Sequence, residues 1–262
     1  MSDNRLHILS SGSKGNAVLV ESGDRLLLID QGLSFKCFTG RCAAAGIDPA
    51  RIAGIVITHE HVDHVSGVPL TAHRLHLPVY AAPAVAALLA GSCDRYEFET
   101  REIAPSRPVA IGPFTVEPFP VMHDARDPYG FTVTLPNGER LTLVTDTGIV
   151  TQRIFAQIAA SDYLIIEANH DPGLLYRNPR YPAELKQRIR SASGHLSNEQ
   201  CLEALGNLSG GRLKKVVFAH LSEENNSPEL VCRSAAECFG RTRFTGESFI
   251  APQEGPLTIP LD

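Results

Sequence analysis

Six strand-like apolar runs in this sequence each end in a residue that can bind a metal or move a proton. The residues that follow these runs are Asp30, His59, His123, Asp146, Glu167 and His220. Strand ends that meet along one edge of a sheet bring distant parts of a chain into one site. Some runs are joined by hairpin signals and others by helical segments. This alternation predicts two mixed sheets packed face to face, with helices outside.

One motif concentrates such residues directly after the apolar run 53–57. It reads Thr58-His59-Glu60-His61-Val62-Asp63-His64. Imidazole and carboxylate are the usual protein ligands of zinc and similar divalent ions. In extended backbone His59 and His61 point to the same side, whereas Asp63 and His64 follow where the chain turns into a helix. The spacing predicts two adjacent metal ions, and the alternative is a polar loop with chance histidines.

Local patterns predict the other elements. We expect strands at 6–9, 17–20, 25–29, 53–57, 79–80, 114–121, 129–135, 140–145, 162–166 and 215–218. We expect helices at 35–45, 63–75, 83–89, 183–190, 198–205 and 228–239. The tripeptide Pro136-Asn137-Gly138 is an Asn-Gly hairpin signal between two of the strands.

Composition restricts the class of protein. The 262 residues and 43% hydrophobic content allow a sizeable core in one large domain or two small ones. The formal charge of −5 counts against a large basic face for nucleic acid. Two local basic clusters exist, 186–190 with Arg177 and Arg180 nearby, and 212–215. For each, a solvated face and a substrate contact are both open.

Nothing in the sequence indicates export or a membrane span. The first residues lack signal-peptide anatomy, and the apolar run 81–90 is short and contains Pro83. No Cys-x-x-Cys pair occurs, so we expect reduced, partly buried thiols at Cys37, Cys42, Cys93, Cys201, Cys232 and Cys238. We therefore predict a cytoplasmic protein without membrane contact. No obligate protein partner is evident, and the oligomeric state is open.

The order of the candidate ligands resembles the metallo-β-lactamase superfamily over nearly the whole chain. The resemblance implies an α/β (α+β) fold, the four-layer αββα sandwich of two mixed sheets flanked by helices. It also implies a dinuclear site that holds two divalent ions, Zn²⁺ or Mn²⁺. The residues implied for the first metal, the second metal and the bridge are, in that order, His59, His61 and His123; Asp63, His64 and His220; and Asp146.

Further details of the site follow from the same resemblance. Asp30 would hydrogen-bond a ligand and fix its orientation. Two carboxylates and five neutral imidazoles leave two divalent ions with a net positive charge. Such a site suits an anionic substrate and makes hydroxide from water near neutral pH. The histidine at His61 disfavours the diiron redox relatives, and Asp146 in place of a cysteine disfavours true β-lactamases.

Five further segments resemble the YycJ/WalJ group, a family of 5′→3′ exonucleases that act on double-stranded DNA. These segments are Leu9–Asn16, Ile166–Asp171, Leu185–Ile189, Gly194–Asn198 and Ala219–Asn226. The resemblance implies DNA as the substrate. The interval between Asp146 and His220 is too short for the extra domain of ribonuclease J-like enzymes, so we expect one domain over 1–262 without an inserted nuclease domain.

Glu167 and His195 resemble the glutamate–histidine pair of ribonuclease Z. There the histidine, oriented by the glutamate, serves as a proton donor. Imidazole suits proton transfer near neutral pH, and a carboxylate fixes its tautomer and raises its pKa. The alternative for His195 is a residue at a helix start that Ser197 or Asn198 caps. Asp63 joins this pair as a catalytic residue because it is both ligand and charge compensator.

Substrate contacts are expected from two loops. The turn-rich segment 10–16 offers backbone N–H groups and the Asn16 amide to a phosphate, and a simple hairpin turn is the alternative. The segment 174–190 offers Lys186 and Arg188.

Three functions follow from these features. The first is a metal-dependent hydrolase, a phosphodiesterase that degrades DNA as an exonuclease. The second is a small-molecule hydrolase that cleaves a cyclic phosphodiester, thioester or lactone at the same metals, which the negative charge and the lack of a clamp domain favour. The third is a non-catalytic metal-stabilised binding module. The spare Glu167–His195 pair argues against it, since a structural metal site needs no proton donor.

Overall fold

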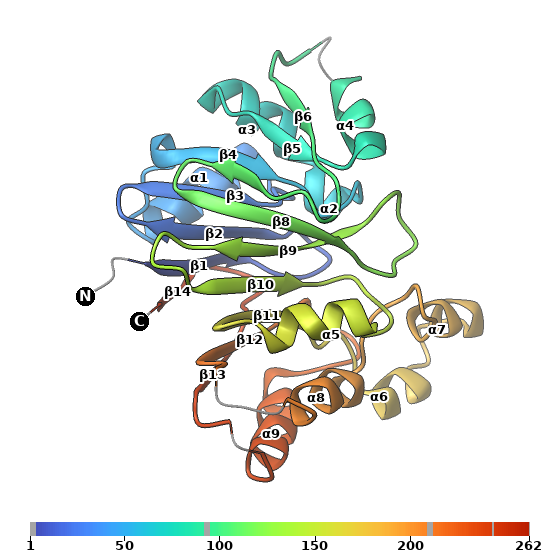
Figure 1. Cartoon of the computed structure of the whole chain (residues 1–262). Coiled ribbons are helices and arrows are strands. Elements are labelled where there is room, and N and C mark those ends of the chain that lie inside the picture. Colours follow the sequence, from blue (N-terminus) through green and yellow to red (C-terminus); the bar gives the residue numbers. More distant parts are fainter. Residues whose placement is uncertain (1–3, 92–94, 209–211, 243, 262) are drawn as a thin grey trace. The chain divides into compact units, whose positions relative to one another are not determined.

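The computed structural model describes residues 4–91, 95–208, 212–242 and 244–261 (Figure 1). Over these residues, fourteen strands form two mixed sheets of seven strands each. The chain divides into two compact units. The first consists of residues 1–119, 125–138 and 252–262, and the second of residues 120–124 and 139–251.

The first unit contains the first and last strands of the chain, which belong to the same sheet. Its strands are β1 (Arg5–Ser10), β2 (Ala17–Ser22), β3 (Arg25–Ile29), β4 (Ile52–Val56), β5 (Val79–Ala81), β6 (Thr100–Glu102), β7 (Val109–Ile111), β8 (Phe114–Pro120), β9 (Tyr129–Thr134) and β14 (Leu257–Pro260). Its helices are α1 (Phe35–Ala44), the 3₁₀ turn η1 (Pro49–Arg51), α2 (Val62–Val65), α3 (Val68–Leu75) and α4 (Pro83–Ala90).

The sheet contained in this unit has the order β14-β1-β2-β3-β4-β5-β6. Its pairs are antiparallel from β14 to β3 and parallel from β3 to β6. Every residue of β2 is buried, which explains why 17–20 reads as a continuous apolar run instead of an alternating one. Helix α1 packs on β1, and α4 packs on β5 and β6.

The second unit alternates strands and helices. Its strands are β10 (Arg140–Val144), β11 (Tyr163–Glu167), β12 (Lys215–Ala219) and β13 (Glu247–Ile250). Its helices are α5 (Gln152–Ala159), α6 (Pro172–Arg177), α7 (Ala183–Ile189), α8 (Asn198–Gly206) and α9 (Pro228–Phe239). The four strands pair in sequence order and all run parallel. Their carboxyl ends therefore lie at one edge, where the residues that follow them gather.

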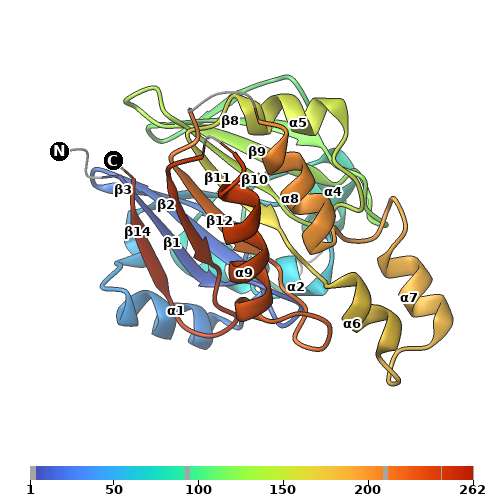
Figure 2. The ribbon, with the colours of Figure 1, turned by 90° about the horizontal axis from the view of Figure 1, so that it is seen from below.

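Local signals in the sequence define the helices of this unit. Thr151 caps α5 by accepting from the Ile154 N–H, and the buried Ile154 and Ile158 lie on one face of that helix. Helix α8 starts with a capping box between Ser197 and Gln200. Helix α8 packs against α9, and α6 and α7 lie beside each other in both views (Figures 1 and 2).

The single helix predicted over 63–75 is wrong. The chain forms α2 and α3 with a break at Ser66 and Gly67. A β-carbon at Gly67 would lie 1.9 Å from the Leu33 carbonyl oxygen, and the Gly67 N–H donates to the Gln31 carbonyl. This close backbone approach needs a glycine and interrupts the helical hydrogen bonds.

Two further findings concern the cysteines and the helices. The described cysteines are free thiols, Cys42 and Cys201 being buried, and Cys93 lies outside the described residues. Among the described helices, none has both the length and the apolar composition needed to cross a membrane.

Candidate active site and metal-binding residues

Three of the strand-end residues share an unusual backbone conformation. Asp30 after β3, Asp146 after β10 and His220 after β12 have φ angles of 57°, 56° and 55°. This left-handed region is uncommon for residues other than glycine and costs on the order of 1–3 kcal/mol, so it persists only where the surrounding structure enforces it. Such strain is concentrated at functional sites, and here it recurs in both units.

In the first unit, Asp30 orients the histidine motif. The Asp30 carboxylate accepts a hydrogen bond from His64 Nδ1 at 2.8 Å. It also accepts from the Thr58 backbone N–H and the Thr58 hydroxyl, each at 2.8 Å. All three residues are buried. With Nδ1 of His64 bound to this carboxylate, Nε2 is the nitrogen that would bind a metal. The contact has the form expected of Asp30, and the orientation of a metal ligand by it stays a prediction.

Three imidazole rings of the motif lie together. The ring centroid of His59 is 4.5 Å from that of His61 and 4.1 Å from that of His64. His59 and His64 are 1% exposed. Imidazole rings gathered in one place form a donor set for a divalent metal. Neutral imidazole is the form that divalent metals bind.

Asn16 contacts Asp63 and His64 of this motif. Its backbone N–H donates to the Asp63 carbonyl at 2.7 Å. Its side-chain NH₂ is 3.3 Å from Asp63 Oδ2 and 3.0 Å from His64 Nε2. The close packing continues at Gly32, where a β-carbon would lie 1.7 Å from the Asp63 carbonyl oxygen. The amide of Asn16 thus supports the ligand motif directly, and the expected contact with a substrate phosphate stays a prediction.

In the second unit, Glu167 is the centre of a hydrogen-bonded cluster. Its side chain is fully buried. Oε1 accepts from His195 Nδ1 at 2.7 Å and is 3.1 Å from His220 Nδ1. Oε2 accepts from the backbone N–H groups of Thr147 and Leu196, both at 3.1 Å. The predicted Glu167–His195 pair is therefore in direct contact. The two backbone donors and the link to His220 were not predicted.

The electrostatics of this pair follow from burial and charge. Burial opposes both charges, but the neighbouring His195 charge and the hydrogen bonds from His195 and His220 lower the pKa of Glu167. Burial likewise works against the His195 charge, and the Glu167 charge with its hydrogen bond outweighs it and raises the pKa of His195. The side chain of His195 is 21% exposed. It is therefore a partly accessible imidazole, held by a carboxylate that favours its protonated form.

His123 and Asp146 border this cluster. His123 Nδ1 lies 3.2 Å from the Gly194 carbonyl oxygen, and its ring centroid is 5.1 Å from that of His195. Burial lowers the pKa of His123, although Asp146 opposes the shift. One ligand atom from each of Asp146, Glu167, His195 and His220 lies within 4.8 Å of the others. A buried carboxylate–imidazole set of this kind fits a divalent metal.

Other residues near the cluster were not assigned from the sequence. The ring of His170 is buried, and burial lowers its pKa to about 4, so it is neutral. Gly148 and Gly194 permit close packing of the loops around the cluster: a β-carbon would lie 2.1 Å from the Ser191 oxygen or 2.2 Å from the Ile189 oxygen, respectively. No sequence pattern at Gly148 indicates its contact, because Ser191 is distant in sequence. The contact of Gly194 is local, since Ile189 is the last residue of α7.

The basic residues proposed as substrate contacts lie on α7. Lys186 Nζ donates to the Tyr176 carbonyl at 2.8 Å, which ties α7 to α6. Arg188 Nε is 2.7 Å from Asp124 Oδ2, next to His123. Both side chains therefore have protein partners, and their binding of substrate stays a prediction.

Comparison with known proteins identifies the family. The model of the beta-lactamase superfamily domain matches residues 25–220. The chain belongs to the β-lactamase superfamily. This superfamily member is 34% identical to exodeoxyribonuclease YycJ of Bacillus anthracis over 92% of both chains. It is 38% identical to exodeoxyribonuclease WalJ of Streptococcus pneumoniae serotype 2 (strain D39 / NCTC 7466), over 85% of this chain and 83% of the relative. These identities place it in the YycJ/WalJ group.

Solved structures agree on the fold. The metallo-β-lactamase fold protein YhfI from Bacillus subtilis matches with a TM-score of 0.73 at 18% identity, over 97% of this chain and 99% of the other. Zn²⁺-bound PqqB from Methylobacterium extorquens matches with the same TM-score and identity, over 98% of this chain and 100% of the other. The predicted metallo-β-lactamase fold of two mixed sheets flanked by helices is confirmed.

Proposed function

We propose that this superfamily member is a metal-dependent exodeoxyribonuclease that shortens duplex DNA from 5′ ends in the cytoplasm. The observation that carries the proposal is the 2.7 Å Glu167–His195 contact beside Asp146 and His220. A proton donor held next to candidate metal ligands suits phosphodiester hydrolysis, because the leaving oxygen needs a proton and the metals stabilise its charge. Relatives that match over most of both chains are named exodeoxyribonucleases, which favours DNA over small phosphodiesters and esters.

The proposal includes two divalent ions, zinc or manganese. The ligands would be His59, His61 and His123 for one ion, Asp63, His64 and His220 for the other, and Asp146 for both. Support comes from the superfamily, from the buried donor sets within each unit, and from Asp30 and Glu167, which hold Nδ1 of His64 and His220 and so orient Nε2. When bound, the ions supply Lewis acidity and lower the pKa of water. The family model extends over both compact units, so we also propose that 1–262 act as one domain.

His195 has the role of general acid in this proposal. Its Nδ1 donates to Glu167, so Nε2 carries the proton that neutralises the departing oxygen. Glu167 fixes the ring and favours the protonated form. The two backbone donors to Oε2 hold the carboxylate itself in place. Asp63 and Asp146 contribute the negative charge that two divalent ions need in a partly buried site.

The test is a time course on duplex DNA labelled at one 3′ end, with zinc or manganese supplied. We expect stepwise shortening of the labelled strand by the wild-type chain. Asp63→Ala should abolish shortening and lower the bound metal measured by mass spectrometry. An intact label with both metals, together with turnover of a cyclic phosphodiester or ester, would replace DNA by a small molecule as the substrate.

A further inference from the structure

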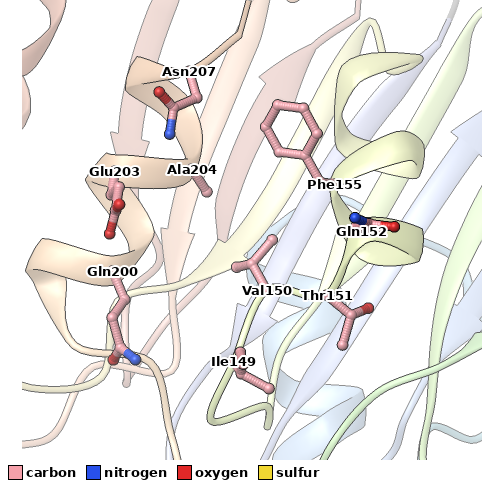
Figure 3. A pocket seen from close by; sticks show the side chains of 9 residues that line it. All are labelled: Ile149, Val150, Thr151, Gln152, Phe155, Gln200, Glu203, Ala204 and Asn207. Atoms are coloured by element: carbon pink, nitrogen blue, oxygen red, sulfur yellow. The ribbon is translucent and has the colours of Figure 1, made fainter.

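A pocket of about 560 Å³ opens between the start of α5 and one face of α8, within the second unit (Figure 3). Phe155 and Val150 face Ala204 across the space between the two helices in this view. On the side of Ala204, the lining also includes Gln200 and Glu203 of α8 and Asn207, the C-cap of that helix. This volume is within the range of small-molecule binding sites. None of the interactions in the Glu167 cluster uses the pocket.

The pocket lining is close in sequence to Asp146, which borders the Glu167 cluster. Ile149, which lines it, follows Asp146 by three residues, so their Cα atoms are at most about 11 Å apart. The Gln200 amide donates to the Gly148 carbonyl at 3.3 Å and accepts from the Ser197 N–H at 2.9 Å. The pocket wall is thereby tied to the loop after Asp146 and to the start of the helix that follows His195.

The chemistry of the lining favours an uncharged group over a phosphate. None of the described residues that line the pocket is a lysine or an arginine, and Glu203 adds a negative charge. Apolar and aromatic groups at Val150, Phe155 and Ala204 suit a flat uncharged ring instead.

Three polar side chains remain available to bind such a ring. Gln152, Glu203 and Asn207 are exposed, and their side chains make no hydrogen bond with another described residue. Glu203 and Asn207 are four positions apart, so they project from the same side of α8. Amides hydrogen-bond the donor and acceptor edges of bases, and a carboxylate accepts from an exocyclic amino group.

We infer that this pocket binds one nucleobase of the DNA strand that is being hydrolysed, with the base against Phe155 and its exocyclic amino group toward Glu203. The inference rests on the proposed function and adds a specificity site to it. Nucleotides of a duplex strand advance by about 3.4 Å each, so 11 Å corresponds to roughly three nucleotides. On this basis we place the bound base among the first few beside the cleaved bond. Thymine, which lacks an exocyclic amino group, should bind least well.

Binding is tested without turnover. Duplexes carrying 2-aminopurine at each of the first four positions from the 5′ end are mixed with the protein in the presence of a chelator. The chain has no tryptophan, so the fluorescence of the base analogue is measured without an indole background. We expect a larger change in 2-aminopurine fluorescence at one position than at the other three. Phe155→Ala should remove this difference. Equal responses at all four positions would overturn the inference.

Turnover gives the second test. A single abasic site is moved through the same four positions, and we expect kcat/KM to fall about ten-fold at one of them, the scale of one base–aromatic contact. Phe155→Ala should cause a similar fall on intact DNA but no further fall on that abasic substrate. This comparison remains valid if the variant is less stable, because the loss of stability would affect both substrates equally.

A matched pair of variants on α8 tests the polar contact. At the identified position, wild-type turnover should favour cytosine or adenine over thymine by roughly ten-fold, and Glu203→Gln should reduce that preference. Glu199→Gln, on the same helix but outside the pocket lining, should retain it. If the wild-type chain shortens DNA without any base preference, the base-binding role of the pocket is rejected and the proposed nuclease function is retained. If the wild-type chain cuts a small phosphodiester but no DNA, both proposals are rejected.

Discussion

Glu167 combines a buried charge with four hydrogen bonds, and this makes its environment specific to a carboxylate. Both oxygens accept, one from imidazoles and one from the N–H groups of Thr147 and Leu196. An amide of the same shape has only one oxygen. In either orientation its NH₂ group would face two donors, either the imidazoles or the backbone N–H groups. Those donors would then be buried without an acceptor. The carboxylate thus fixes His195 by geometry and by charge together.

We predict that Glu167→Gln lowers the free energy of unfolding by about 1–3 kcal/mol, the cost of one unsatisfied buried donor. It should also move the alkaline limb of the kcat profile to lower pH. The sign follows from His195: Glu167 raises its pKa, the acid form is present below that pKa, and activity declines as pH rises through it. Without the charge, the pKa falls and activity declines earlier.

The matched control is Glu139→Gln, which removes a carboxylate that contacts Tyr163 and Lys214 before β10, at the opposite ends of these strands. Its pH–rate profile should overlay that of the wild-type chain. A profile for Glu167→Gln that also overlays the wild type would exclude His195 as the general acid.

The elements that were predicted from the sequence are those with strong local patterns. Helix α9 and strands β3 and β11 were expected almost to the residue, because each is a continuous apolar or amphipathic run with a clear end. Helix α5 was missed although its sequence carries the signals, since Thr151 is a good N-cap and Ile154 and Ile158 have the spacing of one helix face. Strand β14 was missed because four residues gain their place only by pairing with β1, more than two hundred positions earlier.

The same distinction holds for the site. Most ligand candidates are visible as residue types at or just after strand ends, whereas the Glu167–His195 pair was expected from the resemblance to ribonuclease Z. The contacts of Oε2 with Thr147 and Leu196 are not visible in the sequence, because they use backbone groups that any residue carries. The break at Gly67 depends on the loop after β3, which contains Gln31 and Leu33 and has no signature in the sequence around Gly67.

We predict that Gly194→Ala disturbs the turn between α7 and α8 and lowers turnover. A β-carbon there would lie 2.2 Å from the Ile189 oxygen, which accepts from the His195 N–H at 2.9 Å. The backbone must shift, so His195 moves relative to Glu167, and even a small displacement of a catalytic group costs about 10²-fold. Gly206→Ala is the control, since its β-carbon would meet Cys238 at an ordinary 3.6 Å. Equal kcat values for the two variants would contradict the prediction.

Charge across the chain limits where DNA can be held. A net charge of −5 provides no general attraction, so binding has to depend on local groups. In the cluster at 212–215, Arg212 pairs with Asp162, Lys214 with Glu139 and Lys215 with Glu247. On α6 and α7, by contrast, the side chains of Arg177 and Arg190 make no hydrogen bond or ion pair with another described residue. The segment of α6 and α7 is therefore a better candidate for phosphate contacts than the cluster at 212–215.

We predict that Arg177→Ala and Arg190→Ala each weaken binding of duplex DNA and reduce its salt dependence. A cation that neutralises one phosphate contributes about 0.9 to the slope of log K against log salt concentration. Each variant should therefore lower that slope by about one, whatever the sequence of the DNA. Arg212→Ala, which removes a cation already paired with Asp162 at 2.9 Å, should leave the slope unchanged. Binding is measured by fluorescence anisotropy with a chelator present, so that hydrolysis does not interfere. If Arg212→Ala alone lowered the slope, the DNA would have to lie along the start of β12 instead of along α6 and α7.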